Sequence, residues 1–152
     1  MAIRVASVTD GLSNTQFVSE ILQGANDDSR GTVWFDDPGS GSYMTRFTPN
    51  GNQDFLGSGV NVDVVASFVT GVGHSPPHAG ELCDSQPAQM LPCFNSSSEG
   101  AAFGGSRSRH PGGVNTLFGD GSVHFMKNSI NPKTWFNLGT RAGGEVLSSD
   151  SY

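Results

Sequence analysis

Charged side chains are scarce in this sequence of 152 residues. Asp, Glu, Lys and Arg together make up 14% of the chain, against roughly 25% in ordinary soluble domains. The 8 Lys and Arg are scattered and outnumbered by 14 Asp and Glu, which gives a formal net charge of −6. Binding to nucleic-acid phosphates needs a basic surface. The composition therefore argues against a nucleic-acid partner.

Long apolar runs are also missing. A membrane-spanning helix needs roughly 18 or more consecutive apolar residues, and a signal peptide needs a charged segment followed by an apolar one. The printed sequence shows neither pattern. We therefore expect no membrane-spanning segment within these 152 residues.

The sequence lacks the short motifs of common enzymes. It contains no Gly-x-Ser-x-Gly nucleophile turn, no zinc-protease motif and no glycine-rich loop before a helix that would hold a phosphate. We therefore expect no enzymatic activity and assign no catalytic residue.

Cysteine is limited to two residues, Cys83 and Cys93, which enclose nine others. In an oxidising compartment they would close a small loop and stabilise the fold by about 2–3 kcal/mol. In a reducing compartment they would remain free thiols. A zinc site is less well matched, because zinc favours closer Cys-x-x-Cys pairs. We predict the disulfide and keep free thiols as the alternative.

What the chain does contain is typical of β structure. Glycine is abundant, with 21 residues, and short apolar runs alternate with polar residues between turn-forming segments. We predict one mainly β domain of the α+β kind over residues 1–152, with a twisted antiparallel sheet, one or two short helices and long Gly/Pro/Ser-rich loops. Ten Phe and two Trp supply much of its core.

Several segments before the C-terminal part have strand character. A helix remains the other option for residues 15–22, because their apolar positions partly fit both periods. Residues 71–112 show no regular pattern, and such a length without secondary structure is uncommon within a compact domain. We expect a loop-rich insertion there. The expected strands are residues 3–8, 15–22, 31–35 and 60–70, with a weak one at 43–47.

Residues 113–147 predict a β-hairpin followed by a short helix. Two β-type runs, 114–118 and 122–126, are joined by a Gly-Asp-Gly turn. We expect Gly121 to adopt the positive φ that a tight hairpin requires.

The helix is expected to begin at Pro132, since Asn131 is a good N-cap and proline suits the first turn. Trp135 lies on its apolar side, and Gly139 is the expected stop. Trp135 is therefore a candidate structural anchor.

Two blocks of residues together resemble the DUF1559 family, whose members carry a prepilin-type H-X9-DG signature. The resemblance covers about residues 3–35 and 106–147. In the C-terminal block a histidine is followed by nine residues and then Asp-Gly; the upstream block holds another Asp-Gly and a glutamate. The matching residues are His110, Asp120, Gly121 and Trp135 in the C-terminal block, and Asp10, Gly11 and Glu20 in the upstream block.

This resemblance implies a pilin-like or pseudopilin-like protein, extracellular or on the bacterial cell surface. It would be a non-enzymatic subunit or accessory of a filament, self-assembling as a homo-oligomer. Members of the family usually begin with an apolar helix that packs a filament core, and residues 1–152 contain no such helix. Exposed strand edges offer a second route to assembly.

The alternative is a secreted solute- or glycan-binding module, in line with an older label of the same family. Its candidate residues are aromatic side chains that would form a sugar-stacking face: Trp34, Phe35, Tyr43 and Phe47. The competing explanation is that Trp34 and Phe35 are the core and edge residues of one strand.

The signature residues themselves are expected to be structural. We expect His110 to hold the preceding loop to the hairpin, through a contact with Asp120, with metal ligation as the alternative. Asp120 is expected to serve the turn, as aspartate does in many turns, with calcium binding as its alternative.

Calcium is the cofactor that the sequence leaves most open. Asn50, Asn52 and Asp54 have the alternate spacing of a calcium loop, although the later glycine and the glutamate at the twelfth position are missing. His74 and His78 suggest zinc or copper, but the two prolines between them prevent the helix that would align them.

Overall fold

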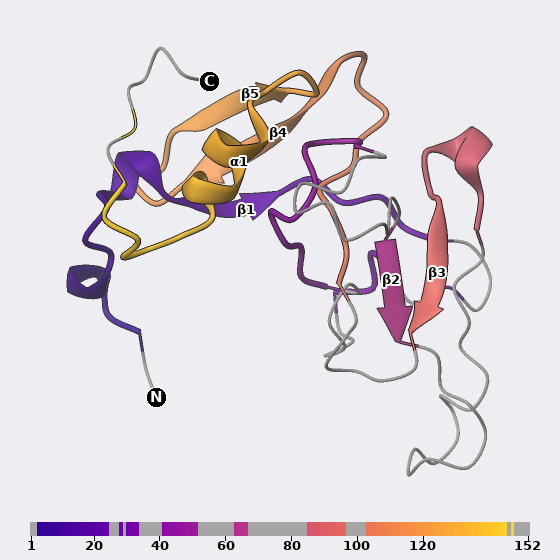
Figure 1. The fold of residues 1–152 in the computed structure, drawn as a ribbon, viewed down its shortest axis with the longest axis horizontal. Coiled ribbons are helices and arrows are strands. Elements are labelled where there is room, and N and C mark those ends of the chain that lie inside the picture. The colour runs from indigo at the N-terminus through magenta and orange to yellow at the C-terminus, as the bar shows by residue number, and fades with distance from the viewer. Residues whose placement is uncertain are drawn as a thin grey trace, which may run out of the picture.

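The described part of the chain consists of two small sheets, one α-helix and the segments that connect them. The computed structural model shows a three-stranded antiparallel sheet, a separate two-stranded sheet and a single α-helix in this part (Figure 1). None of its helices is long and apolar enough to cross a membrane. The described residues are 3–24, 28, 30–33, 41–51, 63–66, 85–96, 103–145 and 147.

The elements follow one another along the chain with long connections. Three of them are single 3-10 turns, labelled η. In order they are η1 (Val5–Ser7), η2 (Leu12–Asn14), β1 (Gln16–Ser19), β2 (Asp63–Ala66), η3 (Pro87–Gln89), β3 (Cys93–Ser96), β4 (Gly113–Phe118), β5 (Val123–Lys127) and α1 (Pro132–Leu138).

The three-stranded sheet has the order β1-β4-β5, so an N-terminal strand lies against the C-terminal hairpin. Both pairs are antiparallel; Val18 lies opposite Leu117 and Leu117 opposite Val123. An irregularity in β1 between Gln16 and Val18 shifts the register. The mainly β, α+β fold class is thereby confirmed, and β1 confirms a strand within residues 15–22.

The β4–β5 hairpin also confirms the expectation. Its turn is closed by hydrogen bonds from Phe118 N to Ser122 O (2.9 Å) and from Gly121 N to Phe118 O (3.0 Å). Gly121 has φ +89°, a conformation that L side chains rarely adopt. At the other end of the hairpin a side chain on Gly113 would collide with the Met126 carbonyl and the Phe125 ring, so the close strand approach requires glycine.

Helix α1 begins and ends where the sequence indicated. The Asn131 Oδ1 accepts hydrogen bonds from the backbone N–H groups of Lys133 (2.9 Å) and Thr134 (3.3 Å), and Pro132 opens the first turn. The helix ends at Gly139, and it buries Trp135 and Leu138. With only seven residues, α1 depends on that packing for its stability.

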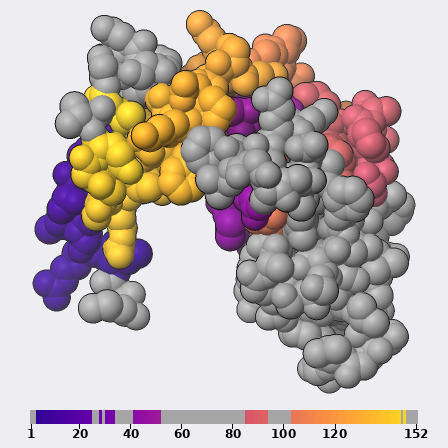
Figure 2. Space-filling model, viewed as in Figure 1, coloured from indigo at the N-terminus to yellow at the C-terminus, as the bar shows by residue number. Residues whose placement is uncertain are grey.

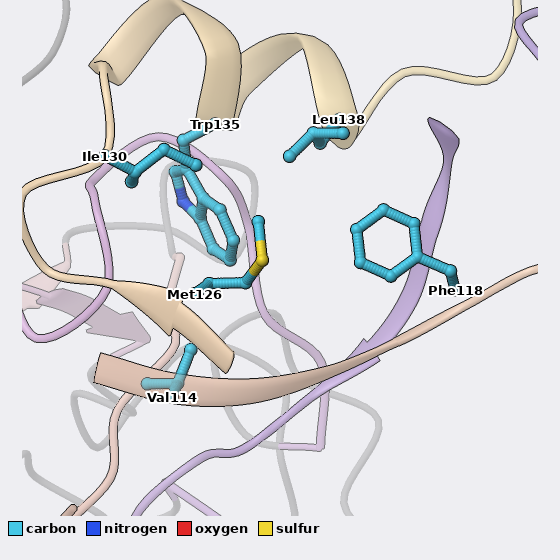
Figure 3. Close-up of a cluster of buried hydrophobic side chains, with 6 residues drawn as sticks. All are labelled: Val114, Phe118, Met126, Ile130, Trp135 and Leu138. Atoms are coloured by element: carbon cyan, nitrogen blue, oxygen red, sulfur yellow. The ribbon is translucent and has the colours of Figure 1, made fainter. Parts of the chain in front are cut away.

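The core lies between α1 and one face of the three-stranded sheet (Figure 3). Trp135 is fully buried there, and Tyr43 packs against the cluster from the 41–51 segment. The opposite face of the sheet is not covered by α1. The six core residues are Val114, Phe118, Met126, Ile130, Trp135 and Leu138.

The second sheet differs from the expected antiparallel pairing. β2 and β3 are parallel, with Asp63 opposite Cys93 and Ala66 opposite Ser96. β2 confirms a strand within residues 60–70 over its described length. β3 lies inside residues 71–112, where only loops were expected, because that stretch lacks the alternation that marks a half-buried strand.

Part of residues 71–112 is packed rather than exposed. Every residue from 103 to 108 is buried, and the rings of Phe47 and Phe103 lie 5.2 Å apart between centroids. Leu91 and Cys93 are buried as well. The loop-rich insertion remains a prediction for the rest of that range.

Two expected strands are wrong. Residues 3–8 contain the turn η1 (Val5–Ser7) and no strand, and Ile3 and Val5 are about two-thirds exposed (66% and 67%). Residues 43–47 form an irregular segment with a turn and no strand pairing, although Phe47 is 1% exposed. Apolar alternation predicts a strand only where a neighbouring strand accepts the backbone hydrogen bonds. Of residues 31–35, the three described ones form no strand and the last two lie outside the described residues.

Candidate functional site

Glu20, in the upstream block, forms hydrogen bonds with residues of the C-terminal block. Its Oε2 accepts a hydrogen bond from Asn115 N (2.8 Å), and its Oε1 accepts one from Asn115 Nδ2 (3.1 Å). The Nε2 of His110 lies 3.0 Å from the same Oε1. Glu20 directly follows β1, whereas His110 and Asn115 lie just before and within β4. This network therefore joins the upstream block to the hairpin.

The expected contact between His110 and Asp120 is wrong. His110 precedes β4 at the open end of the hairpin, whereas Asp120 follows β4 in the hairpin turn. The length of β4, about five residue steps or roughly 17 Å, separates the two residues. The imidazole instead pairs with Glu20 and meets the Phe125 ring edge-on at 6.4 Å. Its side chain remains about half exposed (53%).

Opposing effects act on the Glu20 carboxyl. Partial burial raises the pKa of Glu20. The hydrogen bonds from Asn115 and His110 lower the pKa by more than burial raises it, so the pKa of Glu20 lies below its usual value. Glu20 is therefore an anion at neutral pH and a strong acceptor for these donors.

Asp10 joins the other end of the two blocks. Its carboxylate accepts hydrogen bonds from Gly143 N (2.8 Å), Gly144 N (2.9 Å) and Thr140 Oγ1 (3.3 Å), and the two backbone donors hold the pKa of Asp10 below its usual value. The Asp10 N–H also donates to Arg141 O (3.3 Å). The N-terminal segment and the chain after α1 accordingly lie side by side, indigo against yellow in Figure 2.

Gly11, the second residue of the upstream Asp-Gly, has φ +94° and lets the chain turn into η2. Asp120 stabilises the hairpin turn through its side chain. Its Oδ1 accepts from Ser122 Oγ (2.7 Å) and Ser122 N (2.9 Å), and these bonds lower the pKa of Asp120. Its contacts are local, within two residues.

Of the three calcium candidates, only Asn50 lies among the described residues. Asn50 Oδ1 accepts from Ser108 N (2.8 Å), and Asn50 Nδ2 donates to Gly113 O (3.3 Å), so this side chain links the 41–51 segment to the start of β4. Asn52 and Asp54 lie outside the described residues. Across the described ranges, no group of three or more His, Cys, Asp or Glu side chains converges as a metal site.

Three other predicted features fall partly or wholly outside the described residues. Cys93 is buried at the start of β3, but Cys83 is not described, so their disulfide stays a prediction. His74, His78, Trp34 and Phe35 are not described either. Of the two described members of the aromatic set, Phe47 is buried in the core and Tyr43 borders a groove.

Sequence reasoning missed two buried arginines. Arg30 forms an ion pair with Asp28 (2.6 Å) and donates to the carbonyls of Leu91 (3.1 Å) and Pro92 (3.0 Å). Arg107 donates to Met90 O (3.3 Å). Both hold the 85–96 segment against the rest of the molecule. No spacing signal could have found their long-range contacts, because those acceptors are backbone carbonyls, which any residue provides.

Two grooves lie along the chain from β1 to the residues that follow it. One, of about 460 Å³, lies between β1, the 43–46 segment and the end of α1. The other, of about 330 Å³, lies beside Glu20 and His110. Tyr43 borders the first groove, and burial raises the pKa of its hydroxyl, so Tyr43 stays neutral there.

Comparison with known proteins agrees with the paired blocks. Residues 1–133 match the family described as "Protein of unknown function (DUF1559)". No curated protein and no solved structure matches the chain. The match includes β1, the hairpin and the residues that join them, Glu20, His110 and Asn115. The chain belongs to the DUF1559 family.

Proposed function

We propose that this chain is a non-enzymatic structural domain of a pilin-like or pseudopilin-like protein, extracellular or on the bacterial surface, that assembles with copies of itself. The observation that carries the proposal is the sheet face opposite α1. It exposes four large apolar side chains from all three strands: Val18 (55%), Leu117 (36%), Val123 (62%) and Phe125 (46%).

These four residues, named here the apolar row, are contiguous. Val18 pairs with Leu117 and Leu117 with Val123 across the sheet, and Phe125 lies two residues further along β5. Single exposed apolar residues are common on soluble proteins, whereas a continuous patch is typical of an interaction surface. The low charge of the chain also favours such contacts.

The outer edge of β5 supports a second copy as the occupant. Within the described residues β5 pairs only with β4, so its other edge is open to strand addition. An antiparallel β5–β5 pair centred on Phe125 would place Val123 of one copy opposite Lys127 of the other. The two lysines would then stay apart, and the two apolar rows would become one surface.

The polar signature residues support a structural role for the domain. The carboxylates of Glu20, Asp10 and Asp120 each accept hydrogen bonds from neighbouring parts of the same fold. Carboxylates bonded in this way stabilise the fold. We therefore infer that the signature maintains the fold that displays the apolar row.

Lysine in place of both Leu117 and Val123 is expected to abolish assembly. Association would have to desolvate two new ammonium groups in each copy, which is costly. A cost of only about 1.4 kcal/mol already weakens the affinity about tenfold, so we expect at least that loss. Sedimentation velocity over a concentration series measures the result. The unmodified chain should gain mass with concentration, and the double variant should remain monomeric.

The matched control is Val33→Lys, because Val33 is also exposed (76%) but lies outside the sheet. This variant should assemble as the unmodified chain does. An unmodified chain that stays monomeric at its highest soluble concentration would contradict the proposal. So would a double variant that assembles as well as Val33→Lys.

A further inference from the structure

The groove between β1 and the end of α1 is a second apolar surface of the molecule. Its volume is about 460 Å³, and Phe17 (49%), Met44 (44%) and Phe136 (38%) line it while remaining partly exposed. They come from β1, the 43–46 segment and α1, so folding brings them together. The groove shares no residue with the apolar row, and the two surfaces can therefore make different contacts.

The N-terminal segment of residues 3–8, named here the N-terminal arm, is exposed and loosely held. Residues 3–7 are all exposed, and Figure 1 shows this part of the chain projecting away from both sheets. The described backbone hydrogen bonds of the arm are local and close η1: Ser7 N donates to Arg4 O (2.8 Å) and Val8 N to Val5 O (3.0 Å). Only these two bonds are lost when η1 becomes extended, so the conversion costs little.

An extended arm has an apolar side. Ile3 (66%) and Val5 (67%) flank Arg4, and alternate residues of a strand point to the same side, roughly 7 Å apart. The two aliphatic side chains would then face one way and the guanidinium the other. This is the alternation that predicts a strand, and within the described residues the arm has no strand partner.

We propose that the N-terminal arm of one copy lies extended in the groove of a second copy. Its two aliphatic side chains pack on the aromatic and thioether walls, which suit such contacts. Within the described residues β1 pairs only with β4, so its other edge is open to an added strand. The contact joins two different surfaces, arm and groove, and can therefore repeat from copy to copy.

This inference rests on the proposed function, because it adds a second contact to the same assembly. A β5–β5 pair is two-fold symmetric and closes at two copies. A stable interface buries about 1,200–2,000 Å², whereas even an aromatic side chain supplies only about 150–250 Å², so one arm holds two single copies weakly. A β5–β5 pair carries two arms and two grooves, and two arm contacts at once strengthen its junction with the next pair.

NMR titration with a peptide tests the arm contact by itself. The probe is the N-acetylated peptide of residues 2–9, added to the ¹⁵N-labelled double variant of the apolar row, so that association through that row does not contribute. We expect saturable shifts at the amides of Phe17, Thr45 and Gly139. The same peptide with Ile3→Ser and Val5→Ser should bind at least about tenfold more weakly.

Two further variants of the labelled chain place the site. Met44→Lys puts an ammonium group in the apolar groove and should weaken peptide binding at least about tenfold. Val33→Lys, the same new side chain at an exposed position outside the groove, should leave binding unchanged. The dispersion of the NMR spectra reports whether each variant is folded. Absence of saturable shifts, equal binding of the serine peptide, or equal weakening by the two lysine variants would overturn the proposal.

Sedimentation velocity tests the role of the arm in assembly. The chain with Ile3→Ser and Val5→Ser should stop at two copies, whereas the unmodified chain should grow beyond two. An arm variant that grows as the unmodified chain does would overturn the inference and leave the proposed function standing. Peptide binding in the groove of a chain that does not pair through β5 would contradict the proposed function alone.

Discussion

Replacing Trp135 with alanine is expected to lower the free energy of unfolding by about 3–5 kcal/mol. Trp135 is fully buried at the centre of the cluster between α1 and the sheet (Figure 3). Truncation leaves a cavity among Val114, Met126 and Leu138, which a seven-residue helix cannot refill. A domain of this size has about 5–15 kcal/mol of stability in total. Urea denaturation followed by circular dichroism measures the loss.

Trp135→Phe is the matched control. It keeps an aromatic ring and removes the indole Nε1, which is buried without a hydrogen-bond partner among the described residues. Losing an unmet donor offsets part of the lost packing. Phenylalanine should therefore cost clearly less than alanine, and equal costs would contradict the packing of Trp135 described above.

Arg30→Met is expected to cost about 3–5 kcal/mol of unfolding free energy. The side chains of Arg30 and Asp28 are 3% and 0% exposed, so the change leaves a buried carboxylate without its counter-charge. It also removes the donors to Leu91 O and Pro92 O. The same urea denaturation measures the effect.

The double variant Asp28→Asn, Arg30→Met separates charge from packing. With both charges removed, only the unmet carbonyls and the lost contacts remain. The double variant should therefore be more stable than Arg30→Met alone. Costs that simply add would show that the two side chains do not form the buried ion pair of this structure.

The local part of this fold could be predicted from the sequence. The hairpin and α1 follow from Gly121, Asn131 and Pro132, whose backbone and capping preferences act within a few residues. The core position of Trp135 follows from the apolar side of a short helix. In these cases the determining interactions are close in sequence.

Long-range contacts could not be predicted in the same way. The partner of His110 proved to be Glu20, 90 residues away, and the partners of Asp10 are backbone N–H groups more than 130 residues away. Because every residue except proline has a backbone N–H, the sequence does not indicate which one donates. The parallel β2–β3 pair was missed for a similar reason, because strand direction depends on a crossover path that composition does not specify.

The two blocks of the DUF1559 resemblance thus have a physical explanation. The upstream block supplies two carboxylates, and each holds one end of the C-terminal block: Glu20 at the open end of the hairpin and Asp10 at the chain after α1. The hairpin and helix form locally, and these contacts fasten β1 to them. This joining role of Asp10 and Glu20 is the central claim.

Amide hydrogen exchange measured by NMR tests this claim most directly. Gly143 and Gly144 are exposed, so their amides should be protected only because Asp10 accepts their hydrogen bonds. Asp10→Ala should release both amides, Glu20→Ala should release Asn115, and Asp120→Ala, a control carboxylate, should release Ser122 without affecting the other three. Unprotected Gly143 and Gly144 in the unmodified chain would contradict the claim, as would protection that survives Asp10→Ala.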